Sequence, residues 1–288
     1  MTTHDGQPHA NGDVPATEES LLHLDSGDIH VCQDGPRDAP ALLLIHGSAA
    51  SARSWAAMVP LLAASHRVIR IDLPGHGLSS EPAGGDYETL AQGRAVGTAL
   101  DRLGVEHAVV VGHSSGGYTA TALAEQRSGL VTALVLINTG PSLDAFIPPE
   151  ASEPIGPSQW PPTDEQIRQL ASTGFREGYE IPQDLVDEVR GMTRRAFTTS
   201  MQASLAYLSR QALPGRLAAL GMPLRVIFGD QDRRWRPSSA AGYRAVPGAE
   251  IEWLPGAGHT PILEDPPRTA ALLLAFTVTH TADVRKTT

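Results

Sequence analysis

Cysteine and lysine are almost absent from this chain of 288 residues. The single cysteine, Cys32, cannot form an internal disulfide, and no cysteine–histidine cluster has the sequence spacing of a zinc site. Cys32 is most simply explained as a small residue on a strand. The single lysine, Lys286, lies in the C-terminal tail, which excludes Schiff-base chemistry and P-loop phosphate binding. We therefore expect no metal and no organic cofactor.

Long apolar runs and basic runs are also missing. No stretch of about eighteen apolar residues occurs, so no transmembrane helix and no membrane partner are expected. The N-terminus has neither the basic nor the apolar region of a signal peptide, which makes a cytoplasmic location the default expectation. We expect residues 1–18 to form a disordered tail. A formal net charge of −10 argues against a nucleic-acid partner.

Short apolar runs alternate with helical patterns along most of the chain. Such an alternation predicts an α/β protein with a mostly parallel sheet and helices on both of its faces. The run at 41–45 is continuously apolar, so this strand should be buried on both faces. The expected strands are 21–24 and 29–32 (a hairpin), 41–45, 68–71, 109–111, 133–137, 224–228 and 251–254, and the expected helices among them are 55–62, 90–103, 118–124 and 268–276.

The alternation stops between residues 141 and 214, where no strand-like run occurs. Prolines punctuate a loop there, and helical patterns follow at 164–172, 183–194 and 197–212. We interpret this insertion as a cap over the carboxyl ends of the strands, where ligands of open α/β sheets bind. A plain helical elaboration is the alternative. The expected division is a tail, a core of 19–140 and 215–279, a cap of 141–214, and a second tail of 280–288.

The stretch 109–117, Val-Val-Val-Gly-His-Ser-Ser-Gly-Gly, predicts a strand, a tight turn and a helix. Gly112, Ser114 and Gly116 fit the G-x-S-x-G pattern, in which the glycines let strand and helix approach closely. The apex serine is exposed beside a helix N-terminus, whose N–H groups stabilise negative charge. Ser114 is therefore the candidate nucleophile. Placing Ser115 at the apex would put His113 where the turn needs a minimal side chain.

A serine nucleophile needs a histidine base that is oriented by a carboxylate. In chains with this turn the order is serine, acid, histidine, and of the eleven histidines only His259 and His280 follow Ser114. His259 lies on a glycine-flanked loop after an expected strand, so it is the candidate base. The candidate acid is Asp232, with Asp230 as the alternative, because Asp230 directly follows a glycine and is suited to turn hydrogen bonds.

Two further groups complete the candidate site. The oxyanion hole should use the backbone N–H of Ser115 and a second N–H from the loop after 41–45, for which we select Ser48. Aromatic side chains from the insertion and the sheet edge are candidates for an apolar substrate pocket, although such residues more often belong to a core. These pocket candidates are Trp55, Phe146, Trp160, Tyr207 and Trp235.

Five motifs in this order resemble the α/β-hydrolase superfamily, and the resemblance covers nearly everything between Leu21 and Phe276. They are His46-Gly47, Asp72-Leu73-Pro74-Gly75-His76-Gly77, Gly112-His113-Ser114-Ser115-Gly116, Gly229-x-x-Asp232 and His259-x-Pro261-x-x-Glu264. The resemblance implies an eight-stranded sheet, a cap at 141–214 and a triad of Ser114, Asp232 and His259. It also implies that Asp72, His76 and Glu264 support loops near the site.

A serine nucleophile limits the reactions that the protein is expected to catalyse. Relatives that dehalogenate alkyl halides or open epoxides carry aspartate at the turn, so the serine argues against both reactions. Serine with an oxyanion hole suits attack on an acyl carbonyl, and we predict a hydrolase of a medium-sized, largely apolar ester or lactone. The alternatives are acyl transfer, C–C bond hydrolysis or cofactor-free haloperoxidase and perhydrolase chemistry on the same triad. A small-ligand receptor on this fold is a further alternative.

Overall fold

The computed structural model describes residues 17–148 and 155–281. Most of the expected N-terminal tail therefore lies outside the described residues, as does the segment 282–288. Two boundaries differ from the expectation. The first strand already begins at Glu18, and the last helix continues to Thr281, so His280 belongs to a helix and not to a tail.

A single eight-stranded sheet forms the centre of the molecule, in the order β1-β2-β4-β3-β5-β6-β7-β8. The first two strands form the expected antiparallel hairpin, β2 also pairs antiparallel with β4, and the other pairs are parallel. The strands are β1 (Glu18–Leu22), β2 (Ile29–Asp34), β3 (Ala41–Ile45), β4 (Arg67–Ile71), β5 (Ala108–His113), β6 (Val131–Ile137), β7 (Leu224–Gly229) and β8 (Glu250–Leu254).

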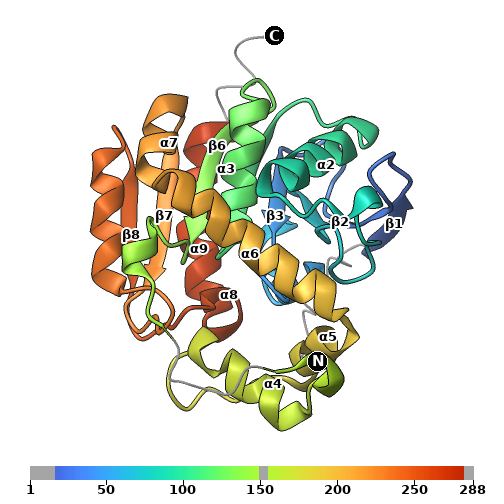
Figure 1. Cartoon of the computed structure of the whole chain (residues 1–288). Coiled ribbons are helices and arrows are strands. Elements are labelled where there is room, and N and C mark those ends of the chain that lie inside the picture. The colour runs from blue at the N-terminus through green and yellow to red at the C-terminus, as the bar shows by residue number, and fades with distance from the viewer. Residues whose placement is uncertain (1–16, 149–154, 282–288) are drawn as a thin grey trace, which may run out of the picture.

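Helices cover both faces of this sheet (Figure 1). On one face, α2 (Thr89–Arg102), α3 (Gly116–Gln126) and α7 (Leu213–Leu220) bury Leu43 and Ile45 of β3 in one apolar cluster. On the other face, α1 (Val59–Leu62) and α9 (Pro266–Thr281) bury Leu42 and Leu44 in a second cluster. Both faces of β3 are thus buried, each in a different apolar cluster, as the continuous apolar run predicted.

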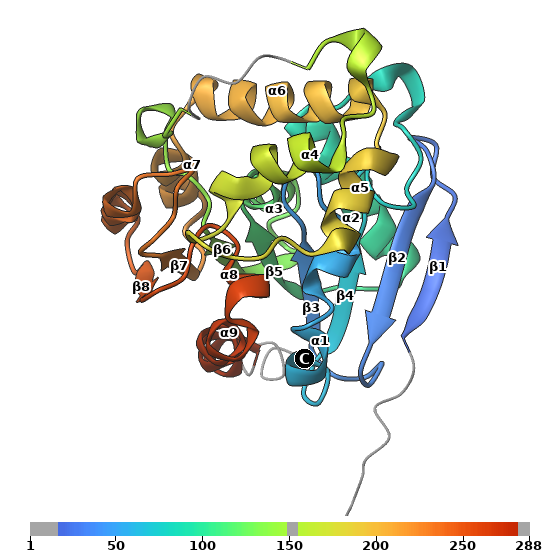
Figure 2. The same cartoon turned by 90° about the horizontal axis from the view of Figure 1, so that it is seen from below.

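Three of the helices between β6 and β7 match the helical patterns of the insertion. They are α4 (Asp164–Ala171), α5 (Gln183–Gly191) and α6 (Arg194–Arg210), and Figures 1 and 2 show them on the side of the sheet where its parallel strands end. The sequence analysis did not predict α7, which crosses the expected boundary at residue 214 and packs on α3. Within 17–148 and 155–281, no helix is both long enough and apolar enough to cross a bilayer.

Candidate active site

Ser114 lies at the tight turn between β5 and α3. Its φ of +52° is in the left-handed region, and its N–H donates to the carbonyl of Ile137 at 2.9 Å. The flanking glycines are needed because a Cβ on Gly112 would lie 2.5 Å from the Gly116 oxygen, and one on Gly116 would lie 2.4 Å from the His46 oxygen. The turn therefore holds the serine in a strained conformation that only close strand–helix packing permits.

The three residues of the expected triad form one chain of hydrogen bonds. Ser114 Oγ lies 2.9 Å from His259 Nε2, and His259 Nδ1 lies 2.8 Å from Asp232 Oδ2. His259 and Asp232 are 1 % and 4 % exposed. Because the carboxylate accepts from Nδ1–H, the Nε2 lone pair is directed to the serine hydroxyl, which is the tautomer a general base requires.

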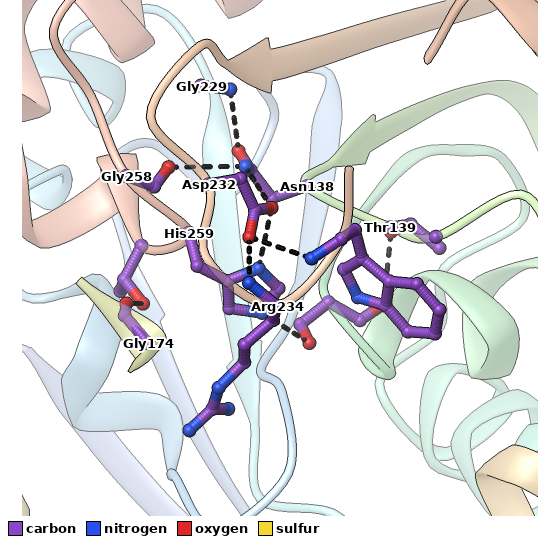
Figure 3. A network of polar contacts seen from close by, with 12 residues as sticks. Asn138, Thr139, Gly174, Gly229, Asp232, Arg234, Gly258 and His259 are labelled. Carbon is purple, nitrogen blue, oxygen red and sulfur yellow. Dashed lines mark hydrogen bonds and ion pairs between the residues drawn. The ribbon is translucent and has the colours of Figure 1, made fainter. Parts of the chain in front are cut away.

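Backbone N–H groups of the turn that carries Asp232 donate hydrogen bonds to its carboxylate and fix its orientation. Its Oδ1 accepts the N–H groups of Arg234 at 2.7 Å and Trp235 at 3.1 Å, and Asn138 Nδ2 donates to Oδ2 at 2.8 Å (Figure 3). Burial acts to raise the pKa of Asp232, but the charge of His259 and these hydrogen bonds hold that pKa below its ordinary value. The side chain is therefore an ionised carboxylate at neutral pH.

Asp230, the alternative acid, does not contact the histidine. It is exposed, and its Oδ1 accepts the backbone N–H of Gly256 at 2.7 Å. The carboxylate thus ties the loop after β7 to the loop after β8. This is the turn hydrogen bonding that its position after Gly229 suggested.

Asn138, which directly follows β6, joins the loops that carry Asp232 and His259, a role that the sequence analysis did not assign. Besides Asp232, its Nδ2 donates to the Gly258 oxygen at 3.2 Å, and its Oδ1 accepts the Gly229 N–H at 3.2 Å (Figure 3). A polar residue directly after a buried strand was the available signal. Asn138 therefore helps to hold the loops of Asp232 and His259 together.

The His259 loop is organised around a fully buried carboxylate. Glu264 accepts the N–H groups on both sides of the histidine, from Gly258 at 2.9 Å and Thr260 at 2.9 Å. A third N–H comes from Arg176 of the inserted segment, at 3.0 Å. Charge-assisted bonds of this kind are stronger than neutral ones, so Glu264 holds both neighbours of the imidazole in place. This agrees with the loop-supporting role that the family resemblance implied.

Glu264→Gln is expected to destabilise the protein by about 2 to 4 kcal/mol, because an amide replaces the charged acceptor and directs its own NH2 group at buried N–H donors. Urea unfolding followed by tryptophan fluorescence measures the change. Glu177→Gln is the matched control, since Glu177 is exposed, and its unfolding free energy should stay within about 0.5 kcal/mol of the wild type. Equal stabilities of the two variants would contradict a structural role for the Glu264 carboxylate.

His113, which precedes Ser114, contacts the backbone of His259. Its Nε2–H donates to the backbone oxygen of His259 at 2.9 Å. Burial and the neighbouring His259 lower the pKa of His113 to about 3, so it is a neutral donor throughout the physiological range. The sequence analysis used His113 only as the reason to exclude Ser115 from the apex of the turn, and found no role for it.

Both residues chosen for the oxyanion hole lie beside Ser114. Ser115 is the N-cap residue of α3, and the Ser48 hydroxyl donates to the Ser115 hydroxyl at 2.8 Å. The loop that carries Ser48 closely approaches the nucleophile, because a Cβ on Gly47 would lie 3.1 Å from Ser114 Cβ. Asp72 also supports this loop by accepting the Ala52 N–H at 2.6 Å.

Two of the five pocket candidates belong to the core. Trp55 is fully buried in the cluster between the sheet and α9, with its ring edge-on to His113 at 6.5 Å. The Tyr207 hydroxyl donates to Glu125 at 2.9 Å, and its ring lies under the Arg216 guanidinium at 4.1 Å. Tyr207 therefore joins α6 to α3. The Trp55 ring packs in the core and the Tyr207 hydroxyl is hydrogen-bonded to α3, and a role of either residue in substrate binding stays a prediction.

The other three candidates lie where the inserted segment meets the sheet. The rings of Phe146 and Trp235 pack edge to face at 5.3 Å, directly after the turn that holds Asp232. Trp160 packs on Phe197 at 5.3 Å, in a small apolar cluster that also includes Ala49 of the Ser48 loop. Their position is compatible with a pocket wall, and their role in substrate binding stays a prediction.

The inserted segment contacts both sides of the site. From α5, Glu188 accepts a hydrogen bond from the Ser51 hydroxyl at 2.5 Å, near the Ser48 loop. Further along, the Gly174 oxygen accepts the Thr260 hydroxyl at 2.6 Å, next to His259. Figure 3 shows the Arg234 guanidinium directed away from the Asp232 carboxylate, and it reaches Thr173 of the insertion at 3.4 Å. The inserted segment is thus hydrogen-bonded to the loops on both sides of Ser114.

Comparisons with known proteins agree with this architecture. The model of the alpha/beta hydrolase family matches residues 42–272. The chain is 28% identical over 242 residues to a 2-hydroxy-6-oxononadienedioate/2-hydroxy-6-oxononatrienedioate hydrolase of Cupriavidus pinatubonensis, covering 79% of this chain and 83% of the relative. It is 26% identical over 259 residues to the monoacylglycerol lipase abhd6-B of Xenopus laevis, covering 84% and 76%. A crystal structure of the N-acyl homoserine lactonase AidH superposes with a TM-score of 0.74 at 21% identity, covering 90% and 96% of the two chains, which is a likeness of fold.

Proposed function

Because the chain belongs to the alpha/beta hydrolase family, we propose that it is a serine hydrolase that cleaves a carboxylic ester or lactone through an acyl-enzyme. The observation that carries the proposal is the chain of hydrogen bonds from Ser114 through His259 to Asp232. In this arrangement each group has the partner that its catalytic role requires. The hydrolase names of the relatives support an enzyme over a receptor.

Acylation begins when Ser114 Oγ attacks the substrate carbonyl while His259 Nε2 takes its proton. Negative charge then develops on the carbonyl oxygen, and the N–H groups of Ser115 and Ser48 are the proposed donors that stabilise it. His259 gives the proton to the leaving alcohol oxygen. In deacylation the same nitrogen takes a proton from water as the water oxygen attacks the acyl carbon. The bond between the acyl carbon and Ser114 Oγ then breaks, His259 returns the proton to Oγ, and the acid is released. Asp232 stays ionised and stabilises the imidazolium in both halves.

The substrate is proposed to be medium-sized and largely apolar. The support is the cluster of Trp160, Phe197 and Ala49, which lies next to the loop that carries Ser48. The segment 141–214 is proposed to act as a cap over this site, in line with its contacts to the Ser48 and His259 loops. We keep acyl transfer and C–C bond hydrolysis as alternatives, because they would use the same three residues.

A chain-length series of p-nitrophenyl esters and lactones tests the substrate class. We expect kcat/KM to rise roughly fourfold for each methylene buried, from acetate up to the length that fills the pocket. A preference for acetate over every longer chain would contradict the apolar pocket. Added alcohol separates the alternatives: acid remains the main product if water deacylates the enzyme, whereas an acyltransferase yields the new ester.

A further inference from the structure

The hairpin of β1 and β2 lies at one edge of the sheet, where β4 and β3 separate it from β5, the strand that leads to Ser114 (Figures 1 and 2). It brings together three side chains of metal-ligating type. In the register of β1 and β2, Glu19 pairs with Cys32. His30 lies two residues before Cys32, on the same face of β2. One ligand atom from each of these residues lies within 4.8 Å of the other two. The sequence spacing gave no sign of this cluster, because strand pairing creates it.

We propose that Glu19, His30 and Cys32 form a binding site for a divalent transition-metal ion of the zinc class. A carboxylate oxygen, an imidazole nitrogen and a sulfur are the ligands that such an ion takes, with a water molecule in the fourth tetrahedral position. Sulfur and nitrogen ligands do not suit Mg²⁺ or Ca²⁺, which take oxygen ligands. The site goes beyond the hydrolytic chemistry and does not depend on it.

His30 is the strongest evidence for a ligand at this position. It is 8 % exposed, and its Nδ1 lies 2.9 Å from the buried Asp72 carboxylate, which accepts the Nδ1–H. The other nitrogen, Nε2, is buried without a hydrogen bond, although Glu19 Oε2 lies 3.4 Å away. A metal-ligating histidine is usually oriented in this way by a carboxylate on its second nitrogen. A cation between Nε2 and Glu19 would satisfy both groups.

The other two proposed ligands differ in exposure to solvent. Cys32 is 3 % exposed, whereas the Glu19 side chain is 61 % exposed, so the ion enters from the solvent side at Glu19. The sulfur binds as the thiolate, and the thiol proton passes to the buffer as the metal–sulfur bond forms. No electrons are exchanged. Asp72 also accepts the Ala52 N–H, so a bound ion would brace the hairpin against the loop that carries Ser48.

Titration of the EDTA-treated full-length protein with Co²⁺ and Zn²⁺ tests the site. We expect about one Co²⁺ per chain, a thiolate-to-cobalt charge-transfer band, and loss of the band when Zn²⁺ displaces cobalt. At Zn²⁺ about 100-fold above its Kd, the unfolding Tm should rise by roughly 4 to 5 °C. Cys32→Ser should abolish the band, and both Cys32→Ser and Glu19→Gln should lower Zn²⁺ affinity by at least roughly 10- to 100-fold.

Glu18→Gln is the matched control, because Glu18 is the neighbouring exposed carboxylate on β1 and pairs with Arg37 instead. Its metal affinity should equal that of the wild type. Two results would overturn the proposal. In the first, the wild type binds no Zn²⁺ by chelator competition, and His30 then serves only as a bridge between Asp72 and Glu19. In the second, Zn²⁺ binds equally well to Cys32→Ser and Glu19→Gln, which assigns the metal to other groups of the chain.

Discussion

Ser114→Ala is expected to lower kcat for ester hydrolysis by roughly a thousandfold to a millionfold while KM changes little. Alanine removes the only atom that forms the acyl bond, and His259 then has no hydroxyl to activate. The residual rate would come from the donors of the oxyanion hole acting on direct attack by water. The turn itself tolerates the change, because alanine is no larger than serine at the position with φ of +52°.

Ser115→Ala is the matched control for this experiment. The Ser115 side chain only accepts a hydrogen bond from Ser48, and its proposed catalytic contribution is its backbone N–H, which alanine retains. We expect a loss of less than about tenfold, since a single neutral hydrogen bond is removed. A fluorophosphonate probe should label the wild type and Ser115→Ala but not Ser114→Ala. Equal rates for the wild type and Ser114→Ala would refute the nucleophile assignment.

Much of this site could be predicted because parallel strands end at the same edge of a sheet. The sequence marks Ser114 and Asp232 by the polar and glycine residues that directly follow apolar runs, and His259 by the glycine before it. Chain order left His259 and His280 as candidates, and only His259 follows an expected strand; the structure places His280 in α9. The G-x-S-x-G pattern also predicted that positions 112 and 116 need glycine, because few other arrangements require two glycines around one serine.

The sequence could not separate core aromatics from pocket aromatics. Trp55 and Tyr207 are apolar rings on helical patterns, and such patterns are equally compatible with packing against the sheet and with facing a ligand. Only three-dimensional neighbours, His113 for Trp55 and Glu125 for Tyr207, distinguish the two. A helix as short as α7, which starts with a proline in its first turn, gave too weak a periodicity to be predicted.

Contacts between distant segments were the second kind of information that the sequence lacked. Glu264 was assigned to loop support through a motif, but its partner Arg176 comes from the insertion, 88 residues away. The Glu19–Cys32 pair depends on strand register, and a shift of one residue would turn one of the side chains to the opposite face. The local periodicity of the sequence predicts individual helices and strands. Strand register and the contacts between loops depend on the packing of the whole chain.

Asp232→Asn is expected to reduce kcat by roughly ten-thousandfold, while Asp230→Asn stays within a few-fold of the wild type. The asparagine amide can present its NH2 group to His259 Nδ1, which would shift the imidazole proton to Nε2 and leave no base for Ser114. The Asp230 carboxylate accepts the Gly256 N–H in the loop beyond β8, and an asparagine oxygen can still accept that bond. Single-turnover kinetics on one ester, with circular dichroism to verify folding, compares the two variants. If Asp230→Asn were the inactive one, the acid would have to be reassigned, and the 2.8 Å contact between Asp232 and His259 would be structural only.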